Sequence, residues 1–398
     1  MRLPRRSRNP DDPNAGGPNA GDPSAGGPKR GGPSAGGPAS RAAAGAGPRH
    51  ARRRWPLLVV AAVCASLVTT LAVRAGAGGP EAGPECREPV SDLLEPACGA
   101  WFGAFVPHAK ADLAEKVEAY ERRVGRRLDI VYTYHDMSEV TATRWEGQLL
   151  TAPEQRVGRD RMLLLSWESK VWGGTEAQQP RWEDIAAGTY DAEVIDVQAR
   201  RIKEYGERND GRKVFLSFDL EMDTRVPEHG TPEEFVAAWR HIHDRFRELG
   251  VDNVIWTWIT TGYPGHREVI RRLYPGDDYV DWIGYNQYNY HRCHRTRWRS
   301  FEETQTAVHR WIRTHLSDDK PLMLSEFGSA HDTARPSRQA EWYRDVPDVL
   351  EKLDGVKAAL QWNSRDPGPH CDLSLANEES WEAMRRLAAD PRLNQPPP

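Results

Sequence analysis

Two runs of apolar residues each lead into a glutamate. The first is residues 214–223 (VFLSFDLEMD), which carries Glu221 near its carboxyl end, and the second is residues 321–328 (PLMLSEFG), which carries Glu326. Short apolar runs of this kind predict buried strands. A retaining glycosidase requires two carboxyl groups, because one must give and take a proton while the other attacks the sugar carbon. The two glutamates therefore predict glycoside hydrolysis.

The first run places further carboxyl groups beside Glu221. A period of two puts Phe215, Ser217, Asp219 and Glu221 on one face of the strand, with Glu221 nearest its carboxyl end. Asp219 and Asp223 flank the glutamate, and the pattern fits two roles for them, as sugar ligands or as solvated carboxylates. The sequence leaves both roles open.

The predicted reaction assigns different work to the two glutamates. Glu326 attacks the anomeric carbon, while Glu221 protonates the departing oxygen and later takes a proton from water. Glu221 then needs a raised pKa, which the nearby carboxylate and an apolar wall such as Leu220 and Met222 can supply. This double displacement requires no cofactor and no metal.

Strands and helices that alternate along the chain must position these residues. The predicted strands are 101–106, 128–134, 162–167, 214–223, 253–259, 279–287, 321–328 and 357–362. Eight such alternations predict an α/β fold, a (β/α)₈ TIM barrel, over residues 99–390. Active sites of this fold lie at the carboxyl ends of the strands. Glu221 and Glu326 should thus face each other across the mouth, with their carboxyl groups about 5 to 5.5 Å apart.

Charge is distributed unevenly between the amino-terminal segment and the rest of the chain. Residues 1–55 contain eleven Lys or Arg and three Asp, a net charge of +8, so the total of −4 leaves −12 on the remainder. An acidic body argues against nucleic acid as its partner.

The chain has 15 tryptophans, most of which we expect in the core and some as stacking platforms for sugars. We expect a monomer.

The amino-terminal segment is predicted to lie outside the folded body. Residues 1–55 are rich in Pro and Gly, contain a five-residue repeat, and predict a disordered cytoplasmic tail. Residues 56–74 are apolar and predict a transmembrane signal anchor. The basic cluster at 49–54 keeps the amino terminus inside the cell, so the body lies outside it. Residues 75–98 form a linker, and residues 391–398 a disordered carboxyl terminus.

A cleaved signal peptide is the alternative to the anchor. Residues 75–77 (AGA) have the small-x-small form of a cleavage site, and cleavage would give a secreted protein. Cysteine usage agrees with export in both cases. Cys64 lies in the membrane segment, and the other four form an even set. Of the three possible connectivities we predict Cys86 with Cys98 and Cys293 with Cys371.

At these residues the sequence resembles glycoside hydrolase family 26, barrel glycanases best known as β-mannanases, over about residues 100–390. The segments that carry the resemblance are Trp167, 185–191 (IAAGTYD), 220–223 (LEMD), 280–288 (VDWIGYNQY), 325–328 (SEFG) and Trp362. The resemblance implies that Glu221 is the acid/base after strand four and Glu326 the nucleophile on strand seven. It further implies that Tyr288 bonds the nucleophile and that Trp362 floors the cleft.

Several positions depart from the family pattern. Leu220 stands where the family has histidine, Asp223 where it has asparagine, and Asn286 where it has aspartate, while residues 224–230 replace a tryptophan-rich turn. These positions contact sugar in the mannanases. The expected substrate is therefore an extracellular β-linked polysaccharide, mannan or another β-glycan.

Polar and aromatic side chains near the predicted strand ends are candidates for substrate binding. Tyrosines 285, 288 and 290 with Asn286 and Gln287 form a strip suited to hydroxyl-rich ligands. The predicted substrate-binding residues are Trp167, Asp219, Asp223, Tyr285, Asn286, Tyr288, Trp362 and His135.

Two other functions fit parts of the sequence. A metal-dependent polysaccharide deacetylase would use His291, Cys293 and His294, with the His-Asp pairs at 135–136 and 331–332, as zinc ligands. Two histidines three apart on a loop lack a fixed ligand geometry, and the disulfide uses Cys293, so no metal site is predicted. A membrane-tethered, non-catalytic glycan-binding protein on a decayed barrel is the other alternative, which the lost histidine and asparagine favour.

Overall fold

The structure, a computed structural model, describes residues 89–109, 111–138, 147–365 and 371–395. The predicted tail, the predicted anchor at 56–74 and Cys86 lie outside these residues. Within the described part, none of the helices has the length and apolar character needed to cross a membrane. The predictions for residues 1–88 therefore stay predictions.

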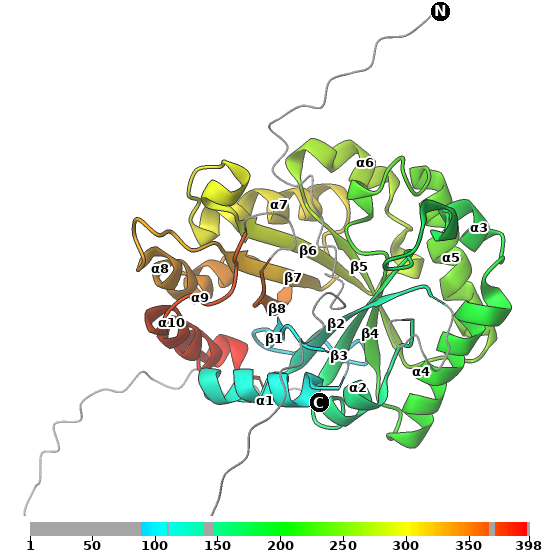
Figure 1. Ribbon diagram of the computed structural model, residues 1–398, viewed down its shortest axis with the longest axis horizontal. Helices are drawn as coiled ribbons and strands as arrows, with labels where there is room; N and C mark the ends of the chain where they lie inside the picture. Colours follow the sequence, from blue (N-terminus) through cyan, green and yellow to red (C-terminus); the bar gives the residue numbers. More distant parts are fainter. Residues whose placement is uncertain (1–88, 110, 139–146, 366–370, 396–398) are drawn as a thin grey trace, which may run out of the picture. The chain divides into compact units, whose positions relative to one another are not determined.

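Eight parallel strands close into a barrel in sequence order (Figure 1). The strands are β1 (Trp101–Phe105), β2 (Ile130–Asp136), β3 (Met162–Glu168), β4 (Val214–Phe218), β5 (Val254–Thr260), β6 (Trp282–Asn289), β7 (Leu322–Ser329) and β8 (Val356–Trp362). Pairing of β1 with β8, which sets Trp101 opposite Ala358, completes the ring. The predicted TIM barrel is confirmed, and only the fourth strand ends well short of its predicted limit.

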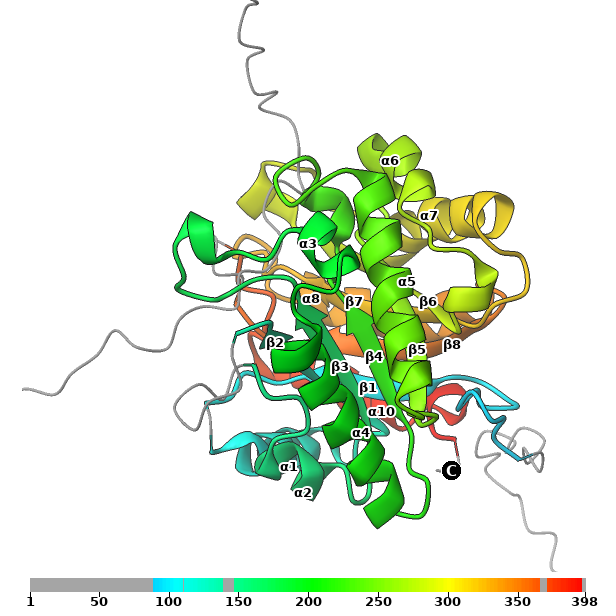
Figure 2. The same cartoon turned by 90° about the vertical axis from the view of Figure 1, so that its right-hand side faces the viewer.

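Helices surround the strands and cover their outer faces. They are α1 (Leu113–Val124), α2 (Ala152–Val157), α3 (Trp182–Ala186), α4 (Asp196–Arg208), α5 (Pro232–Glu248), α6 (Arg267–Arg272), α7 (Phe301–His315), α8 (Arg338–Arg344), α9 (Val346–Leu350) and α10 (Glu378–Ala388). Figure 2 shows α4 and α5 lying over β3 to β5. At the start of α5, the Thr231 hydroxyl accepts a hydrogen bond from the amide of Glu234, and the Glu234 side chain bonds the Thr231 amide in return, which forms a capping box.

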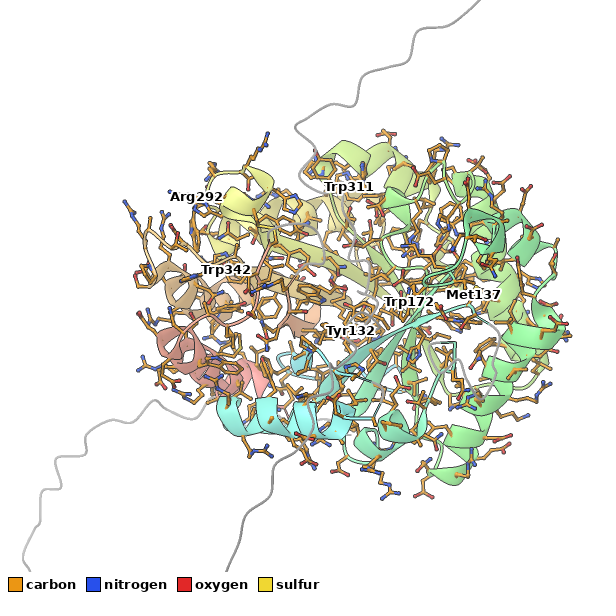
Figure 3. The ribbon with its side chains drawn as sticks, in the orientation of Figure 1. Tyr132, Met137, Trp172, Arg292, Trp311 and Trp342 are labelled. Atoms are coloured by element: carbon orange, nitrogen blue, oxygen red, sulfur yellow. A yellow bond between two sulfur atoms is a disulfide. The ribbon has the colours of Figure 1, made fainter. Side chains whose placement is uncertain are left out.

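Alternation along the strands divides the core into two layers. The inner layer draws on all eight strands; its members include Tyr132, Leu164, Phe215 and Met323. The outer layer joins the remaining strand residues to the helices and includes Trp342. Figure 3 shows Tyr132 within the ring of strands and Trp342 among the surrounding helices. The parity of a residue on its strand therefore decides whether it reaches the barrel interior.

Both ends of the described chain pack against the barrel, although the sequence predicted a linker and a disordered terminus there. Residues 89–98, predicted as linker, pack Leu94 against the inner layer, and Trp101 Nε1 donates to the Leu94 carbonyl over 2.7 Å. Pro391–Leu393 form a short helix that buries Leu393 fully. Residues 391–395 are thus part of the fold, because an apolar side chain anchors them, rather than a disordered terminus.

Candidate active site

A backbone bend presents Glu221 at the mouth of the barrel. Strand β4 ends at Phe218, and both Asp219 (φ 53°) and Glu221 (φ 52°) adopt the left-handed conformation, which is strained for these residue types. The amide of Glu221 donates to the Ile259 carbonyl over 2.9 Å. The predicted period of two therefore stops before the glutamate, and the bend sets its direction.

Asp219 anchors this bend. Its carboxylate accepts hydrogen bonds from the backbone amide of Ser169 at 3.1 Å, the Ser169 hydroxyl at 2.5 Å and Trp182 Nε1 at 2.6 Å. It also forms an ion pair with Arg225, which in turn binds Glu168 over 2.8 Å. Asp219 is fully buried, so of its two predicted roles the solvated one is wrong. These contacts use both carboxylate oxygens within the protein.

Asp223 is likewise held by protein groups. One oxygen accepts from the Thr260 hydroxyl at 2.9 Å and the Thr261 amide at 3.0 Å. The other accepts from the Thr261 hydroxyl and contacts His266 Nδ1 at 2.9 Å. Only 3% of Asp223 is exposed, which again rules out a solvated carboxylate. Asp223 ties the segment after Glu221 to the end of β5.

Glu326 lies within β7 and receives two tyrosine hydroxyls. Tyr288 donates to Oε2, and Tyr134 donates to Oε1 over 2.8 Å. Trp362 Nε1 donates to the Tyr134 oxygen over 3.0 Å, which orients that hydroxyl toward the carboxylate. The contact that the family resemblance implied for Tyr288 is therefore present. Tyr134 was missed, although its parity with the inward-facing Tyr132 indicates the barrel interior.

Glu221 receives one donor, the amide of Asn286 on β6. Asn286 Nδ2 donates to Glu221 Oε1 over 2.9 Å, and both side chains are buried. Asn286 lies opposite Glu326 in the pairing of β6 with β7. The structure thus brings Glu221, Asn286, Glu326 and Tyr288 together at the mouth of the barrel.

The two carboxyl groups differ in their electrostatic surroundings. Burial raises the pKa of Glu221, and the charge of Glu326 raises it further. The hydrogen bond from Asn286 acts in the opposite sense and lowers it. Burial also raises the pKa of Glu326, but the hydroxyls of Tyr288 and Tyr134 oppose this shift by stabilising the ionised form. When the pair shares one proton, we therefore assign it to Glu221.

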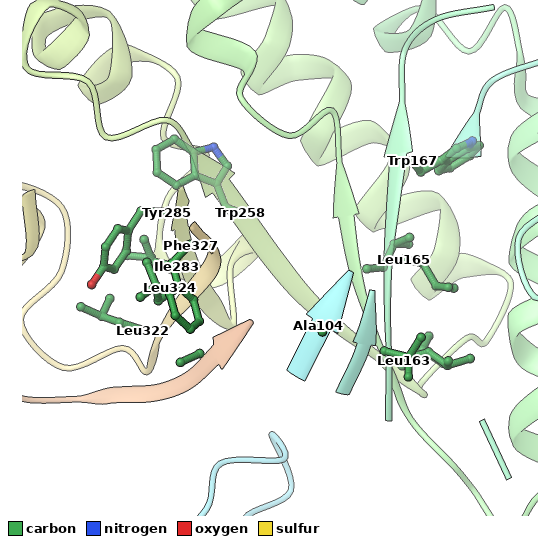
Figure 4. Packing of buried hydrophobic residues seen from close by; sticks show 14 of the residues in the cluster. Ala104, Leu163, Leu165, Trp167, Trp258, Ile283, Tyr285, Leu322, Leu324 and Phe327 are labelled. Atoms are coloured by element: carbon green, nitrogen blue, oxygen red, sulfur yellow. The ribbon is translucent and has the colours of Figure 1, made fainter. Parts of the chain in front are cut away.

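Three predicted substrate-binding residues face away from the barrel interior. Trp167 and Tyr285 are fully buried in the outer layer, where Trp167 follows Leu163 and Leu165 along one face of β3 (Figure 4). His135 points away as well, and its Nε2 contacts Glu154 of α2 over 2.7 Å. Their alternation on the strands prevents contact with a sugar at the mouth. These three predictions are corrected to core positions.

Trp362 lies in a small apolar cluster beside Glu326. The cluster also contains Tyr288, Cys371 and Leu373, with Tyr290 and Cys293 packed against it. The predicted disulfide between Cys293 and Cys371 is present. It uses the cysteine of the alternative zinc site, and no group of three potential metal ligands occurs in the described ranges.

The other predicted disulfide is described at one end. Cys98 is disulfide-bonded, but its predicted partner Cys86 lies outside the described residues. This pairing therefore stays a prediction.

A closed (β/α)₈ barrel whose mouth holds two buried glutamates, each with its own donors, is an arrangement that a retaining glycosidase requires. Residues 225–353 match the family described as glycosyl hydrolase family 26. This segment contains Tyr288 and Glu326 and begins after Glu221. This part of the chain is similar to glycosyl hydrolase family 26.

Curated relatives match parts of the chain. Endoglucanase H of Acetivibrio thermocellus is 27% identical over 276 residues, which is 64% of this chain and 27% of that protein. Beta-1,3-xylanase TXYA of a Vibrio species is 32% identical over 146 residues, which is 36% of this chain and 28% of that protein. The chain thus spans about a quarter of the length of these relatives.

Solved structures share the fold. A family 26 β-mannanase from Bacteroides ovatus superposes with a TM-score of 0.53 at 17% identity, covering 75% of this chain and 91% of that one. A modular endo-β-1,4-mannanase from Cellulomonas fimi gives a TM-score of 0.52 at 18% identity, with 74% and 71% covered. At these identities the likeness concerns the barrel itself.

Proposed function

We propose that the protein is a retaining glycoside hydrolase that acts on a β-linked polysaccharide. The observation that carries this proposal is the pair of buried glutamates with unlike donors. Glu326 receives two tyrosine hydroxyls, which favour a carboxylate ready to attack, and Glu221 receives one amide and keeps a raised pKa. A neutral acid beside an ionised nucleophile is the starting state that double displacement requires.

The reaction has two balanced steps. In the first, a Glu326 oxygen bonds to the anomeric carbon, the bond to the departing oxygen breaks, and Glu221 gives that oxygen its proton. In the second, Glu221 takes a proton from water, whose oxygen bonds to the anomeric carbon and releases Glu326. Each carboxyl group ends in its original state, and the sugar keeps its anomeric configuration.

The substrate class follows from the relatives and from the departures at the site. The relatives are called endoglucanase, β-1,3-xylanase and endo-β-mannanase, and all three names refer to polysaccharides. Leu220, Asp223 and Asn286 depart from the mannanase pattern, and Asp223 is fully engaged by protein groups. We therefore propose a β-glucan or β-xylan ahead of mannan.

We propose in addition that the barrel works outside the cell and is tethered to the membrane by residues 56–74. The disulfide between Cys293 and Cys371 supports this location, because disulfides persist in oxidising compartments. Cleavage after residue 77 would release the same domain as a secreted enzyme.

Reducing-sugar release from a panel of polysaccharides tests the activity. The panel holds β-1,4-glucan, mixed-linkage and β-1,3-glucans, β-1,4- and β-1,3-xylans and mannan, and Glu326→Ala serves as the paired variant. We expect turnover of at least one glycan that the variant abolishes, with the first product in the β form by proton NMR. Binding without turnover in both proteins would instead identify a non-catalytic glycan-binding protein.

A further inference from the structure

Asn286 links the bend that carries Glu221 to strand β7 through both ends of its amide. Its Nδ2 donates to Glu221 Oε1 over 2.9 Å, and its Oδ1 accepts from the Ser325 hydroxyl over 2.8 Å. Asn286 is 2% exposed and Ser325 is fully buried. Ser325 directly precedes Glu326 on β7, so a continuous chain of contacts joins the backbone of the nucleophile to the carboxyl group of the acid/base.

We propose that Asn286 is a positioning residue that aims Glu221 and sets its proton affinity, and that Ser325 fixes which end of the amide meets Glu221. This inference rests on the proposed function for its catalytic meaning. A primary amide has a donor end and an acceptor end. Because the Ser325 hydroxyl donates to the oxygen, the NH₂ group is left to face Glu221.

The direction of this hydrogen bond determines its effect. A donor stabilises the ionised form of a carboxyl group and therefore lowers its pKa. Burial and the charge of Glu326 act in the opposite sense on Glu221. Since Glu221 must be an acid in one step and a base in the next, it needs an intermediate pKa. The hydrogen bond from Asn286 stabilises the ionised form and so keeps the pKa of Glu221 from rising further.

Other charged and titratable groups also face Glu221, from each element packed around it. They are Glu326 of β7, Asp223 and Arg225 after β4, Tyr132 of β2 and Tyr288 of β6. Among the described residues, Asn286 alone donates a hydrogen bond to the Glu221 carboxyl group. If Asn286 is replaced, no other described residue donates a hydrogen bond to Glu221 in its place.

Three substitutions separate the proposed role from simple packing. Asn286→Asp replaces the donor with a second carboxylate, and we expect it to move the alkaline limb of kcat/KM upward by about one pH unit. Asn286→Ala removes the donor and moves the same limb upward by less. Ser325→Ala frees the amide to turn its oxygen toward Glu221 and produces a smaller upward shift.

Asn289 provides a matched control on the same strand. It is also fully buried, and its Nδ2 donates to the hydroxyl of a serine, Ser329, over 3.0 Å without contact to either glutamate. Asn289→Asp introduces the same chemical change into β6. We expect it to leave both limbs of the pH profile in place, so any general effect of a buried new carboxylate is measured separately.

A titration without substrate keeps this proposal distinct from the proposed function. The side-chain carboxyl of Glu221 is followed by ¹³C NMR, with its signal assigned by Glu221→Gln, in the parent and in Asn286→Asp, Asn286→Ala and Ser325→Ala. An upward shift in all three supports the role even if no glycan in the panel is hydrolysed. An unchanged Glu221 titration in the folded alanine variants overturns it, even if their turnover is reduced.

Discussion

The hydroxyl of Tyr288 is one of the tyrosine hydroxyls that favour the ionised form of Glu326, so its removal should change the pH dependence of the activity. In Tyr288→Phe the pKa of Glu326 should rise, because the donor that opposes burial is lost. We expect kcat/KM to fall about 10-fold to 100-fold, the worth of a hydrogen bond to a charged group. The acid limb of the kcat/KM profile should move to higher pH.

Tyr343→Phe is the control for this prediction. Tyr343 is a fully buried tyrosine of α8 whose hydroxyl accepts from Gln361, away from both glutamates. It should leave the acid limb unchanged. A loss of activity in Tyr288→Phe that is equal at every pH would show that the tyrosine supports the shape of the site and not the charge of Glu326.

At the scale of residues, the sequence predicted the glutamates better than their neighbours. Glu221 and Glu326 stood out because a carboxyl group at the end of an apolar run has no role in a core. Trp167 and Tyr285 were misplaced because aromatic residues fit both a cleft and a core, and only strand parity separates the two. Tyr134 was missed because it lies in a run that reads as an ordinary buried strand.

The buried contact between His135 of β2 and Glu154 of α2 should make the fold sensitive to acid. Burial alone would raise the pKa of Glu154, but His135 and the hydrogen bonds from Thr133 and Thr151 lower it to about 2. A carboxyl group with a lowered folded pKa adds stability above its unfolded value of about 4.5, and this is lost as the pH falls toward 2. The shift corresponds to about 3 kcal/mol.

Urea unfolding of Glu154→Gln at pH 7 and pH 3 measures this contribution. We expect the variant to be less stable than the parent at pH 7 and the difference to shrink at pH 3. Glu204→Gln is the control, because Glu204 forms an exposed pair with Arg208 on α4 and should change little at either pH. A stability difference that does not depend on pH would assign the loss to packing.

At the scale of elements, the pattern predicted the strands but not the bend after β4. Apolar runs specify where strands lie, since each must be covered on both faces. Asp219, at the start of the bend, is held by Ser169 and Trp182, which lie 50 and 37 residues before it in the sequence. Local periodicity carries no information about such contacts, so the prediction extended the strand through the bend.

For the whole molecule, the described barrel carries the proposed catalytic site, and the basic segment lies before it in the sequence. The alternation of eight strands and helices predicted the barrel, since each strand needs a helix to cover its outer face. It did not predict that residues 89–98 and 391–395 belong to the fold. Val90 and Leu94 of the first segment pack against the inner layer, and Leu393 anchors the second. These side chains do not form the regular spacing of a strand or helix.

The subcellular localisation of the full chain tests the predicted membrane anchor. Eighteen uncharged residues from Pro56 to Val73 span about 27 Å as a helix, close to the hydrocarbon thickness of a bilayer. We expect the full chain, expressed in a bacterial host, to pellet with membranes and resist carbonate extraction, and a variant lacking residues 56–74 to stay soluble. Protein in the medium that begins near residue 78 would replace the anchor with a cleaved signal peptide, because cleavage after residues 75–77 removes the apolar segment from the mature chain.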